Sequence, residues 1–503
     1  MWPIIHLSVF ILISTLIMVC MINWMFYTVI AVILFLFAVG IHDLTQKKHT
    51  ILRNFPVIGH LRYLLETIAP EIHQYFIESN TDGKPIDRNH RSYIYKRAKL
   101  QNETHPFGTE LDLESENFSW MQHSIYPAKT SEALPRTGIG GGNCTQPYSA
   151  SIFNISAMSF GALSKNAVTA LNLGAKAGGF FHDTGEGGIA DYHLQGGDLV
   201  YELGTGYFGS RNDDGSFSPE KFRVNAAKTE VKMIEIKLSQ GAKPGHGGIL
   251  PAPKNCPEIA RIRGVEPFTE VVSPPGHRAF SDADGLLKFV DELRRLSDGK
   301  PVGFKLCIGN KNEFEEICRK MTETGIKPDF ITIDGAEGGT GSAPIDFSNY
   351  VGMPWERGLV FAVDTVNGYG LKQDIAVLTA TKIITAFDIF KALCIGADVC
   401  SSARGMMMAL GCIQALKCNN NECPTGVATQ NPRLVRGLVV EEKWKRVKNY
   451  HHETVRDFLA LMAAAGCTDL SQLNRSMIHK KVNNQILSYR EIYPDVPSGS
   501  YLK

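Results

Sequence analysis

Residues 301–335, PVGFKLCIGNKNEFEEICRKMTETGIKPDFITIDG, decide the fold class of this 503-residue chain. Two short apolar runs, 301–309 and 329–335, predict buried β-strands. The segment between them, 312–325, predicts an amphipathic helix. A strand, a helix and a second strand in this order indicate a βαβ unit with two parallel strands.

The same alternation continues on both sides of this unit, with amphipathic helices such as 164–179 and 283–299 between several apolar runs. Eight strands with helical crossovers in roughly 270 residues fit an α/β (β/α)8 TIM barrel, whose usual size is about 250 residues. A doubly wound α/β sheet is the alternative, but it has no evident need for eight strands. The predicted strands are 150–158, 179–185, 231–239, 269–275, 301–309, 329–335, 374–380 and 397–403.

Glycine-rich loops follow most of these strands, as in AMSFGALS (157–164), TGEGG (184–188) and DGAEGGTGSAP (334–344). In a barrel, the loops at the C-terminal ends of the strands meet at one end, where the chemistry takes place. Together they suit a flat, phosphorylated cofactor held by backbone N–H groups. No G-x-G-x-x-G opens a strand–turn–helix unit with an acidic residue downstream, and no P-loop motif occurs, which weakens both nucleotide readings.

The N-terminus is the one strongly apolar region, because residues 4–40 contain no Asp, Glu, Lys or Arg. A membrane span needs ~20 apolar residues, so residues 1–42 predict two transmembrane helices in a hairpin that turns near Asn23 and Trp24. Lys47, Lys48 and Arg53 follow. By the positive-inside rule, both termini and the catalytic domain lie in the cytoplasm, anchored to the inner or plasma membrane.

Three segments follow the hairpin: a connecting collar at 43–150, the barrel at 151–435 and a helical C-terminal tail at 436–503. The formal net charge of +1 offers no excess positive field for binding nucleic acid. Most of the 11 cysteines are scattered, as expected in a reducing compartment without a disulfide framework. The oligomeric state is left open.

Three cysteines are the exception, because Cys412, Cys418 and Cys423 lie in one stretch with the spacing C-x5-C-x4-C-P. Zinc prefers four ligands in close pairs, whereas three thiols and a following proline fit an iron–sulfur cluster better. Buried, inert cysteines are the alternative that spacing alone leaves open.

The motifs together resemble a known family. In order they are SAMSFGALS (156–164), TGEGG (184–188), QGAKPGHGG (240–248), SPPGH (273–277), GGTGSAP (338–344), MPWERGL (353–359) and LGCIQALKCNNNECPTGVATQ (410–430). This order is similar to that of the synthase domain of glutamate synthase, over roughly residues 130–435. The whole chain resembles the smaller, membrane-anchored branch of FMN-binding glutamate synthase-related proteins.

The resemblance implies an FMN-binding barrel with a [3Fe-4S] cluster on Cys412, Cys418 and Cys423. In the family, electrons pass through the cluster to FMN, which reduces the imine formed from 2-oxoglutarate and ammonia to glutamate. The resemblance assigns catalytic roles to Glu186 and Lys243, and substrate contacts to Lys243, Arg263 and Ser159. It assigns FMN contacts to Ala157, Met158, Ser159, Lys305, Gly338, Gly339, Thr340, Gly341, Lys382, Ser402, Ala403 and Arg404.

The chain also departs from the family. Ile249 stands where glutamate synthase has a Gln that orients the keto acid, His246 replaces a Glu, and Thr381 and Lys382 replace a Gly-Gly pair. The glutaminase domain and an NAD(P)H-binding unit have no counterpart here, so ammonia and electrons come from outside, the latter from a ferredoxin-like or membrane-linked donor. Two alternatives stay open: flavin and iron–sulfur electron transfer with another amino acid, keto acid or quinone, and a non-catalytic ligand-binding barrel at the membrane.

Overall fold

The computed structural model describes residues 2–101 and 104–502. The chain divides into two compact units, Met1–Pro85 and Ile86–Lys503. The first holds the apolar N-terminus and the second holds the barrel. Each unit is described by itself below.

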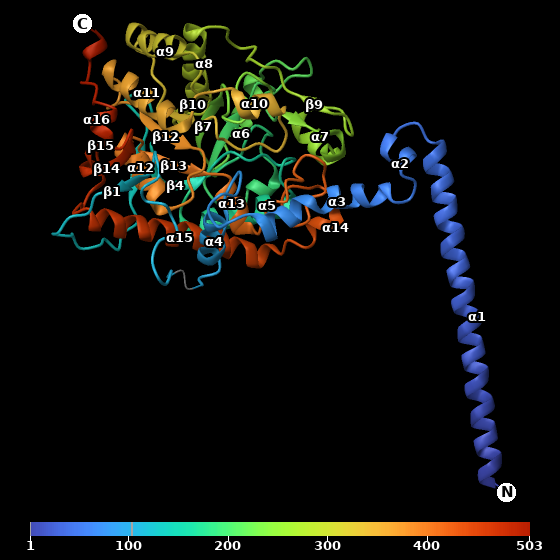
Figure 1. Cartoon of the computed structure of the whole chain (residues 1–503). Coiled ribbons are helices and arrows are strands. Elements are labelled where there is room, and N and C mark those ends of the chain that lie inside the picture. The colour runs from blue at the N-terminus through green and yellow to red at the C-terminus, as the bar shows by residue number, and fades with distance from the viewer. Residues whose placement is uncertain (1, 102–103, 503) are drawn as a thin grey trace. The chain divides into compact units, whose positions relative to one another are not determined.

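The N-terminal unit contains one long helix, α1 (Trp2–Thr45), in place of the predicted pair of spans (Figure 1). The prediction of a hairpin with a turn at Asn23 and Trp24 is therefore wrong. The stretch offers no glycine or proline between residues 4 and 39 to break a helix, and a single polar Asn does not stop one. Residues 10–45 are long and apolar enough to cross a membrane. The helices α2 (Thr50–Asn54) and α3 (Gly59–Ile72) follow, and a π-helical turn spans His73–Ile77.

The second unit is built on a closed barrel of eight parallel strands, which confirms the predicted barrel. Neighbouring strands pair in register around the ring, for example Phe304 with Ile331 and Ser402 with Ile155. In ring order the strands are β4 (Phe153–Ile155), β5 (His182–Asp183), β6 (Leu199–Leu203), β7 (Val231–Lys237), β10 (Val302–Cys307), β11 (Phe330–Asp334), β12 (Ala376–Ala380) and β13 (Val399–Ser402).

Helices connect most of the strands. Several begin at side-chain caps, as where Ser164 accepts a hydrogen bond from the N–H of Ala167 and Asp282 accepts one from Gly285. The short connection from β5 to β6 contains only a 3-10 turn, Asp191–His193. The helices around the barrel are α5 (Lys165–Gly178), α6 (Pro219–Ala226), α8 (Ala283–Leu296), α9 (Lys311–Thr324), α11 (Trp355–Gly368), α12 (Ala386–Ile395) and α13 (Arg404–Leu410).

The N-terminal end of the barrel is closed by a hairpin of β2 (Arg136–Ile139) and β3 (Tyr148–Ser151). Ile139 and Ala150 of the hairpin belong to one buried cluster with interior residues of the barrel such as Phe330 and Leu378. Because apolar side chains fill this end, the functional site is left to the opposite end, where the strands finish.

One predicted barrel strand is wrong and one was missed. The run 269–275 yields only β9 (Val271–Val272), which pairs antiparallel with β8 (Ile249–Leu250) outside the barrel. The missing member of the ring is β6, LVYEL at 199–203, which is completely buried. Glu202 interrupts the apolar run of β6, so the hydrophobic pattern of the sequence did not predict a buried strand there.

The C-terminal tail is not helical throughout. The helices α14 (Pro432–Val435) and α15 (Val440–Ala464) come first, and α15 packs along α5 and α4 (Arg88–Ala98) (Figure 1). A β-hairpin follows, β14 (Ile478–Val482) and β15 (Gln485–Ser488), and then the short α16 (Tyr489–Ile492). The hairpin pairs with β1 (Ser119–Met121) in a three-stranded sheet, so the tail ties the collar to the barrel unit.

Candidate active site at the barrel mouth

An ion pair lies at the centre of the barrel mouth. Glu186 follows β5, Lys237 ends β7, and the Lys237 Nζ lies 2.7 Å from the Glu186 Oε1. Burial acts to raise the pKa of Glu186, but the charge and hydrogen bond of Lys237, with Lys243 and Arg263 adding to them, lower it to about 2. Glu186 is therefore a carboxylate at every physiological pH.

Lys243 lies on the loop after β7 and is 4% exposed. Its Nζ donates a hydrogen bond to the Ser342 carbonyl oxygen at 3.0 Å, on the glycine-rich loop that follows β11. Burial lowers the pKa of this ammonium to about 8, against the opposing effect of Glu186. Lys243 is thus a cation that can release its proton close to neutral pH.

Arg263 ends the helix α7 (Pro257–Arg263) and is 5% exposed. Its Nη2 donates to the Ser159 hydroxyl at 3.3 Å and to the Phe160 carbonyl at 3.1 Å, and the guanidinium lies over the Phe208 ring at 5.0 Å. Burial lowers its pKa to about 10. Its Nε has no hydrogen-bond partner among residues 2–101 and 104–502, which leaves one donor for a ligand.

The charges of this site do not balance. Lys237, Lys243 and Arg263 are each at most 8% exposed and all act on the one carboxylate of Glu186. Among residues 2–101 and 104–502, Glu186 is the one acidic group that acts on Lys243 and Arg263, so two buried positive charges remain unbalanced. Burying unpaired charge is costly, so the site favours an anionic ligand, best one with two negative groups.

Backbone approaches backbone very closely at the first two predicted cofactor loops. A Cβ at Gly185, whose φ is 63°, would lie 2.6 Å from the Ser159 nitrogen, and one at Gly187 would lie 2.8 Å from the Ser159 Cβ. Only glycine fits at such positions. The segment 157–159 and the loop TGEGG are thus packed against each other, with Ala157, Met158 and Ser159 at the rim of the mouth.

A second contact joins the other predicted cofactor residues. The loop 338–341 lies against Arg404, because a Cβ at Gly339 would be 2.9 Å from the Arg404 Cδ. The Arg404 Nη2 donates to the Glu337 carbonyl at 2.6 Å. Ser402 ends β13, and Ala403 precedes α13. The structure therefore brings the loop of Gly338, Gly339, Thr340 and Gly341 against Arg404, which follows Ser402 and Ala403 in the chain.

Thr381 and Lys382 keep a glycine-like backbone. Their φ angles are 113° and 45°, in the region that favours glycine. The Thr381 hydroxyl donates to Asp334 and accepts a 2.7 Å hydrogen bond from the N–H of Gly335. The polar contacts of the threonine thus hold the strained turn after β12 against the loop after β11.

The three clustered cysteines lie on the loop after α13, and Cys418 borders the mouth. A Cβ at Gly341 would be 4.0 Å from the Cys418 Cβ. Burial raises the pKa of Cys412 to about 12, and the charges of Cys418 and Cys423 act in the same direction, so the three cysteines lie within electrostatic reach of one another. At Cys423, hydrogen bonds from the Thr425 side chain and from backbone N–H groups outweigh burial and lower the pKa.

Lys305 lies within the barrel, where it is 4% exposed on β10. Its Nζ lies 2.7 Å from Glu202 Oε2 and 3.8 Å from Glu235 Oε2. The carboxylates outweigh burial and raise its pKa, so it stays charged. Lys305, which was predicted to contact FMN, is thus paired inside the barrel with acidic side chains of β6 and β7.

Two charged residues of the site were missed in the sequence. Lys237 forms the central ion pair, and Lys254 buries its Nζ among the carbonyl oxygens of Ala162, Cys418 and Ala428 at 2.6, 3.1 and 3.2 Å. A signal was present for Lys237, because a lysine that ends an otherwise buried strand points to a paired charge. Lys254 had no such signal, since its partners come from three distant segments.

A family model described as a conserved region in glutamate synthase matches residues 141–468. The chain belongs to the glutamate synthase family. It is an oxidoreductase of glutamate synthase type.

Members of this family differ in how much of their length the chain covers. It is 35% identical over 504 residues to the glutamate synthase large subunit-like protein YerD of Bacillus subtilis, covering 92% of this chain and 95% of YerD. It is 31% identical over 321 residues to the archaeal glutamate synthase (NADPH) of Methanocaldococcus jannaschii, covering 63% of this chain and 60% of that protein. In the glutamate synthase (NADPH) large chain of Bacillus subtilis, the matched part is 20% of the protein.

Proposed function

We propose that the protein is a membrane-anchored oxidoreductase that uses FMN and a [3Fe-4S] cluster to convert 2-oxoglutarate, or a related keto acid, and ammonia into the amino acid. Electrons come from an external donor, ferredoxin-like or membrane-linked. The unbalanced positive charge around Glu186 supports this proposal most directly, because a dicarboxylate keto acid supplies the two missing negative charges.

Each charged side chain has a distinct role in this proposal. Arg263 offers its free Nε–H to one carboxylate of the keto acid, and Lys243 binds the other as a point charge. Glu186 stays ionised and accepts hydrogen bonds from the positively charged nitrogen of the iminium. Hydride addition to the iminium leaves a neutral amine, and Lys243, with a pKa of about 8, supplies the proton that converts this amine to the ammonium.

The loops of the mouth fit FMN. When bound, FMN supplies the hydride that reduces the imine. The cradle includes Gly185, where a Cβ would clash with the backbone of Ser159, and Gly339, which lies against the Arg404 side chain. Ala157, Met158 and Ser159 would lie along the flavin and Lys305 below it, while Ser402, Arg404 and Lys382 would hold the phosphate.

The cysteine loop fits a three-cysteine cluster. Its donor set is three thiols within electrostatic reach of one another, and backbone N–H groups act on Cys423. The loop borders the glycines 338–341 at Cys418, so Cys412, Cys418 and Cys423 would hold the cluster beside the flavin loops.

The substrate position differs from the family at Ile249. Ile249 is half-buried in β8, and a Cβ on its neighbour Gly248 would lie 2.5 Å from Glu186 Oε1. The side chain at 249 therefore belongs to the wall of the site, and isoleucine offers no hydrogen bond there. We expect binding of 2-oxoglutarate to depend on Lys243 and Arg263 more than in relatives that have Gln.

Two measurements test the proposal on the full chain in detergent. The visible spectrum and flavin extraction should show one FMN with broad iron–sulfur absorbance, and Cys418→Ser should remove only the iron–sulfur part. A colourless protein would falsify the redox function.

Turnover is tested by glutamate formation from 2-oxoglutarate and ammonia with a chemically reduced ferredoxin. Lys243→Met and Arg263→Gln should each raise KM roughly 10- to 100-fold, as expected for losing a hydrogen bond to a charged group. Lys165→Met, at an exposed lysine on α5, is the matched control and should change nothing. Turnover of quinone with no keto-acid dependence would contradict the proposal.

A further inference from the structure

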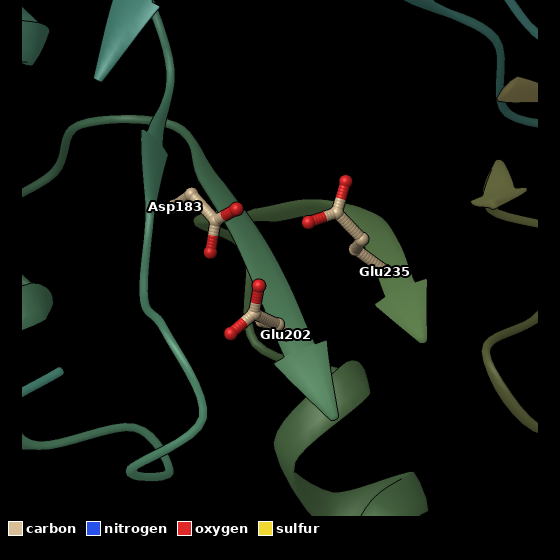
Figure 2. A group of neighbouring side chains, drawn as sticks. All are labelled: Asp183, Glu202 and Glu235. Carbon is tan, nitrogen blue, oxygen red and sulfur yellow. The ribbon is translucent and has the colours of Figure 1, made fainter. Parts of the chain in front are cut away.

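A group of three carboxylates inside the barrel includes the two that contact Lys305. Asp183 on β5, Glu202 on β6 and Glu235 on β7 place carboxylate oxygens within 4.8 Å of one another, and each side chain points toward the other two (Figure 2). All three residues are at most 5% exposed. Such a cluster is costly unless its charge is neutralised.

The surrounding groups neutralise only part of this charge. Lys305 is the cation in contact, with its Nζ 2.7 Å from Glu202, and Asp334 on β11 adds a further negative charge near Lys305. Thr332 on β11 donates to Glu235 Oε1, and the N–H of Gly185 donates to Asp183 Oδ1 at 2.9 Å. In the described part of the chain, Glu235 Oε2 accepts no hydrogen bond.

Three buried carboxylates beside one ammonium cannot all be ionised, because like charges at this separation repel strongly in a medium of low dielectric. Burial and the charge of Glu202 raise the pKa of Asp183. Burial also raises the pKa of Glu235, and carboxylate oxygens of Glu235 and Asp183 lie within 4.8 Å of each other. A divalent cation would neutralise the group as well, but it would lie against the charged ammonium of Lys305.

We propose that Asp183, Glu202 and Glu235 form a proton-holding site, in which Asp183 and Glu235 share one proton and Lys305 pairs with the remaining negative charge. The free Glu235 Oε2 is the atom placed to take part in the shared hydrogen bond. Two carboxyl groups that share one proton are the usual solution for such a pair.

The position of the site suggests what the proton is for. A small interior cavity is lined by Asp183, Glu235 and Lys305, and also by Ser156 and Ser401, which immediately precede the mouth loops at 157–159 and 402–404. Resting on the proposed function, the site supplies a proton when the external donor delivers electrons to the cofactor at the mouth. The proton moves from the Asp183–Glu235 pair to the reduced cofactor, and solvent refills the pair, so the buried charge stays unchanged.

Infrared spectroscopy of the full chain in detergent tests the proton directly. At neutral pH the protein should show a carbonyl band from a protonated carboxylic acid, and Glu235→Gln should remove it. Glu323→Gln, at an exposed carboxylate on α9, should leave the band in place. Thr332→Val should shift the band without removing it, which distinguishes a lost proton from a misfolded barrel.

Two results would overturn this proposal. One is absence of the carboxylic-acid band in the protein without substitutions, and the other is a divalent metal ion bound at one per chain and lost in Glu235→Gln. The link to turnover has its own test, because reduction of the flavin should change the same band. If extraction finds no flavin while the band is present, the proton site stands and the proposed function fails.

A different surface supports a second inference, on the N-terminal unit. On α3, the side chains of Leu61, Leu64, Leu65, Ile68 and Ile72 recur at helical spacing and are 37–57% exposed. Such a stripe on a soluble surface is normally covered. The opposite side of the helix is charged, with Arg62 and Glu66 paired at 2.8 Å.

The beginning of α3 is held at the C-terminal end of α1. Asp43, in the last turn of α1, is fully buried and accepts hydrogen bonds from the N–H of Val57 at 2.9 Å and from His60 Nε2 at 3.0 Å. Where α1 spans a bilayer, this end meets the lipid headgroups. Lys47, Lys48 and Arg53 in the connection suit an anionic headgroup region.

We infer that α3 lies in the membrane interface and buries its apolar stripe among the lipids, so that the N-terminal unit has a spanning helix and an interfacial helix. The full chain is tested with a photo-crosslinking amino acid in native membranes. A probe at position 65 should capture lipid, and a probe at position 66 should capture far less.

A probe at position 34, inside α1, separates this inference from the proposed anchor. Lipid capture at 34 without capture at 65, or capture of a second copy of the chain at 65, would overturn the interfacial helix. Absence of lipid at all three positions would contradict the membrane anchor itself.

Discussion

Lys243 combines deep burial with a retained charge, and this makes ligand binding pH-dependent. Its pKa is lowered to about 8 by burial, so the ammonium is present below pH 8 and is lost as the pH rises through that value. We expect the Kd for 2-oxoglutarate, measured by the change in flavin absorbance, to be constant below pH 7 and to rise up to about tenfold per pH unit above pH 8.

Lys243→Arg is the control for this dependence, because a guanidinium keeps its charge to much higher pH. In this variant the rise in Kd should move beyond pH 9, whatever the absolute affinity. A profile that is identical in the two proteins would show that another group titrates.

Thr381 is a second residue whose chemistry can be isolated. A β-branched residue at a φ of 113° is strained, and its hydroxyl contacts with Asp334 and Gly335 compensate. We expect Thr381→Val to lower the free energy of unfolding by about 1–3 kcal/mol, measured with urea, because it keeps the shape and leaves buried polar groups unpaired. Thr381→Ser keeps the hydroxyl and removes the branch, so it should be neutral or stabilising.

Site residues that lie in recognisable motifs were predictable, and site residues outside such motifs were not. The sequence motifs predicted Glu186, Lys243 and Arg263 as site residues, and in the structure Lys243 and Arg263 both act on the Glu186 carboxylate. The motifs did not name Lys254, because its three carbonyl partners belong to residues 162, 418 and 428. Asp183, Glu202 and Glu235 escaped for the same reason, since three separate strands bring them together.

At the scale of elements, the C-terminal hairpin shows a turn that depends on two residues. Asn483 and Asn484 connect β14 to β15 with φ angles of 51° and 59°, as a type I′ turn requires. We expect Asn484→Val to destabilise the hairpin by about 1–2 kcal/mol, since valine resists this conformation. Hydrogen exchange of residues 478–488 should accelerate in Asn484→Val and not in Asn484→Gly; equal rates in both would contradict the assignment of the turn.

The errors at this scale have physical causes. The hydrophobic periodicity and the length of the apolar runs predicted seven of the eight barrel strands, because each is a short apolar run between turn residues. They failed at β6, where the interior of the barrel accepts Glu202 beside Lys305. They also failed at 269–275, where a run with the right composition has no neighbouring strand in the ring. Pairing partners, and not composition, decide such cases.

At the scale of the whole molecule, the relatives share different extents of this chain. The alignment covers 60% of the archaeal relative and 20% of the Bacillus large chain. YerD aligns over 95% of its length and shares this chain's overall extent. In the proposed function, the N-terminal helix α1 anchors the barrel unit to the membrane, where an external electron donor would reach it.

The single helix α1 leads to a topology different from that of a hairpin. One span places the Trp2 end of α1 and the barrel unit on opposite sides of the membrane, whereas two spans place them on the same side. With Lys47, Lys48 and Arg53 on the cytoplasmic side, we expect an N-terminal epitope tag to be cleaved by protease added outside intact cells. Ser131→Cys, at an exposed position of the barrel unit, should react with a membrane-impermeant maleimide only after the cells are opened. Protection of both sites in intact cells would support the two-span hairpin, because a single continuous spanning helix cannot return the N-terminus to the cytoplasm.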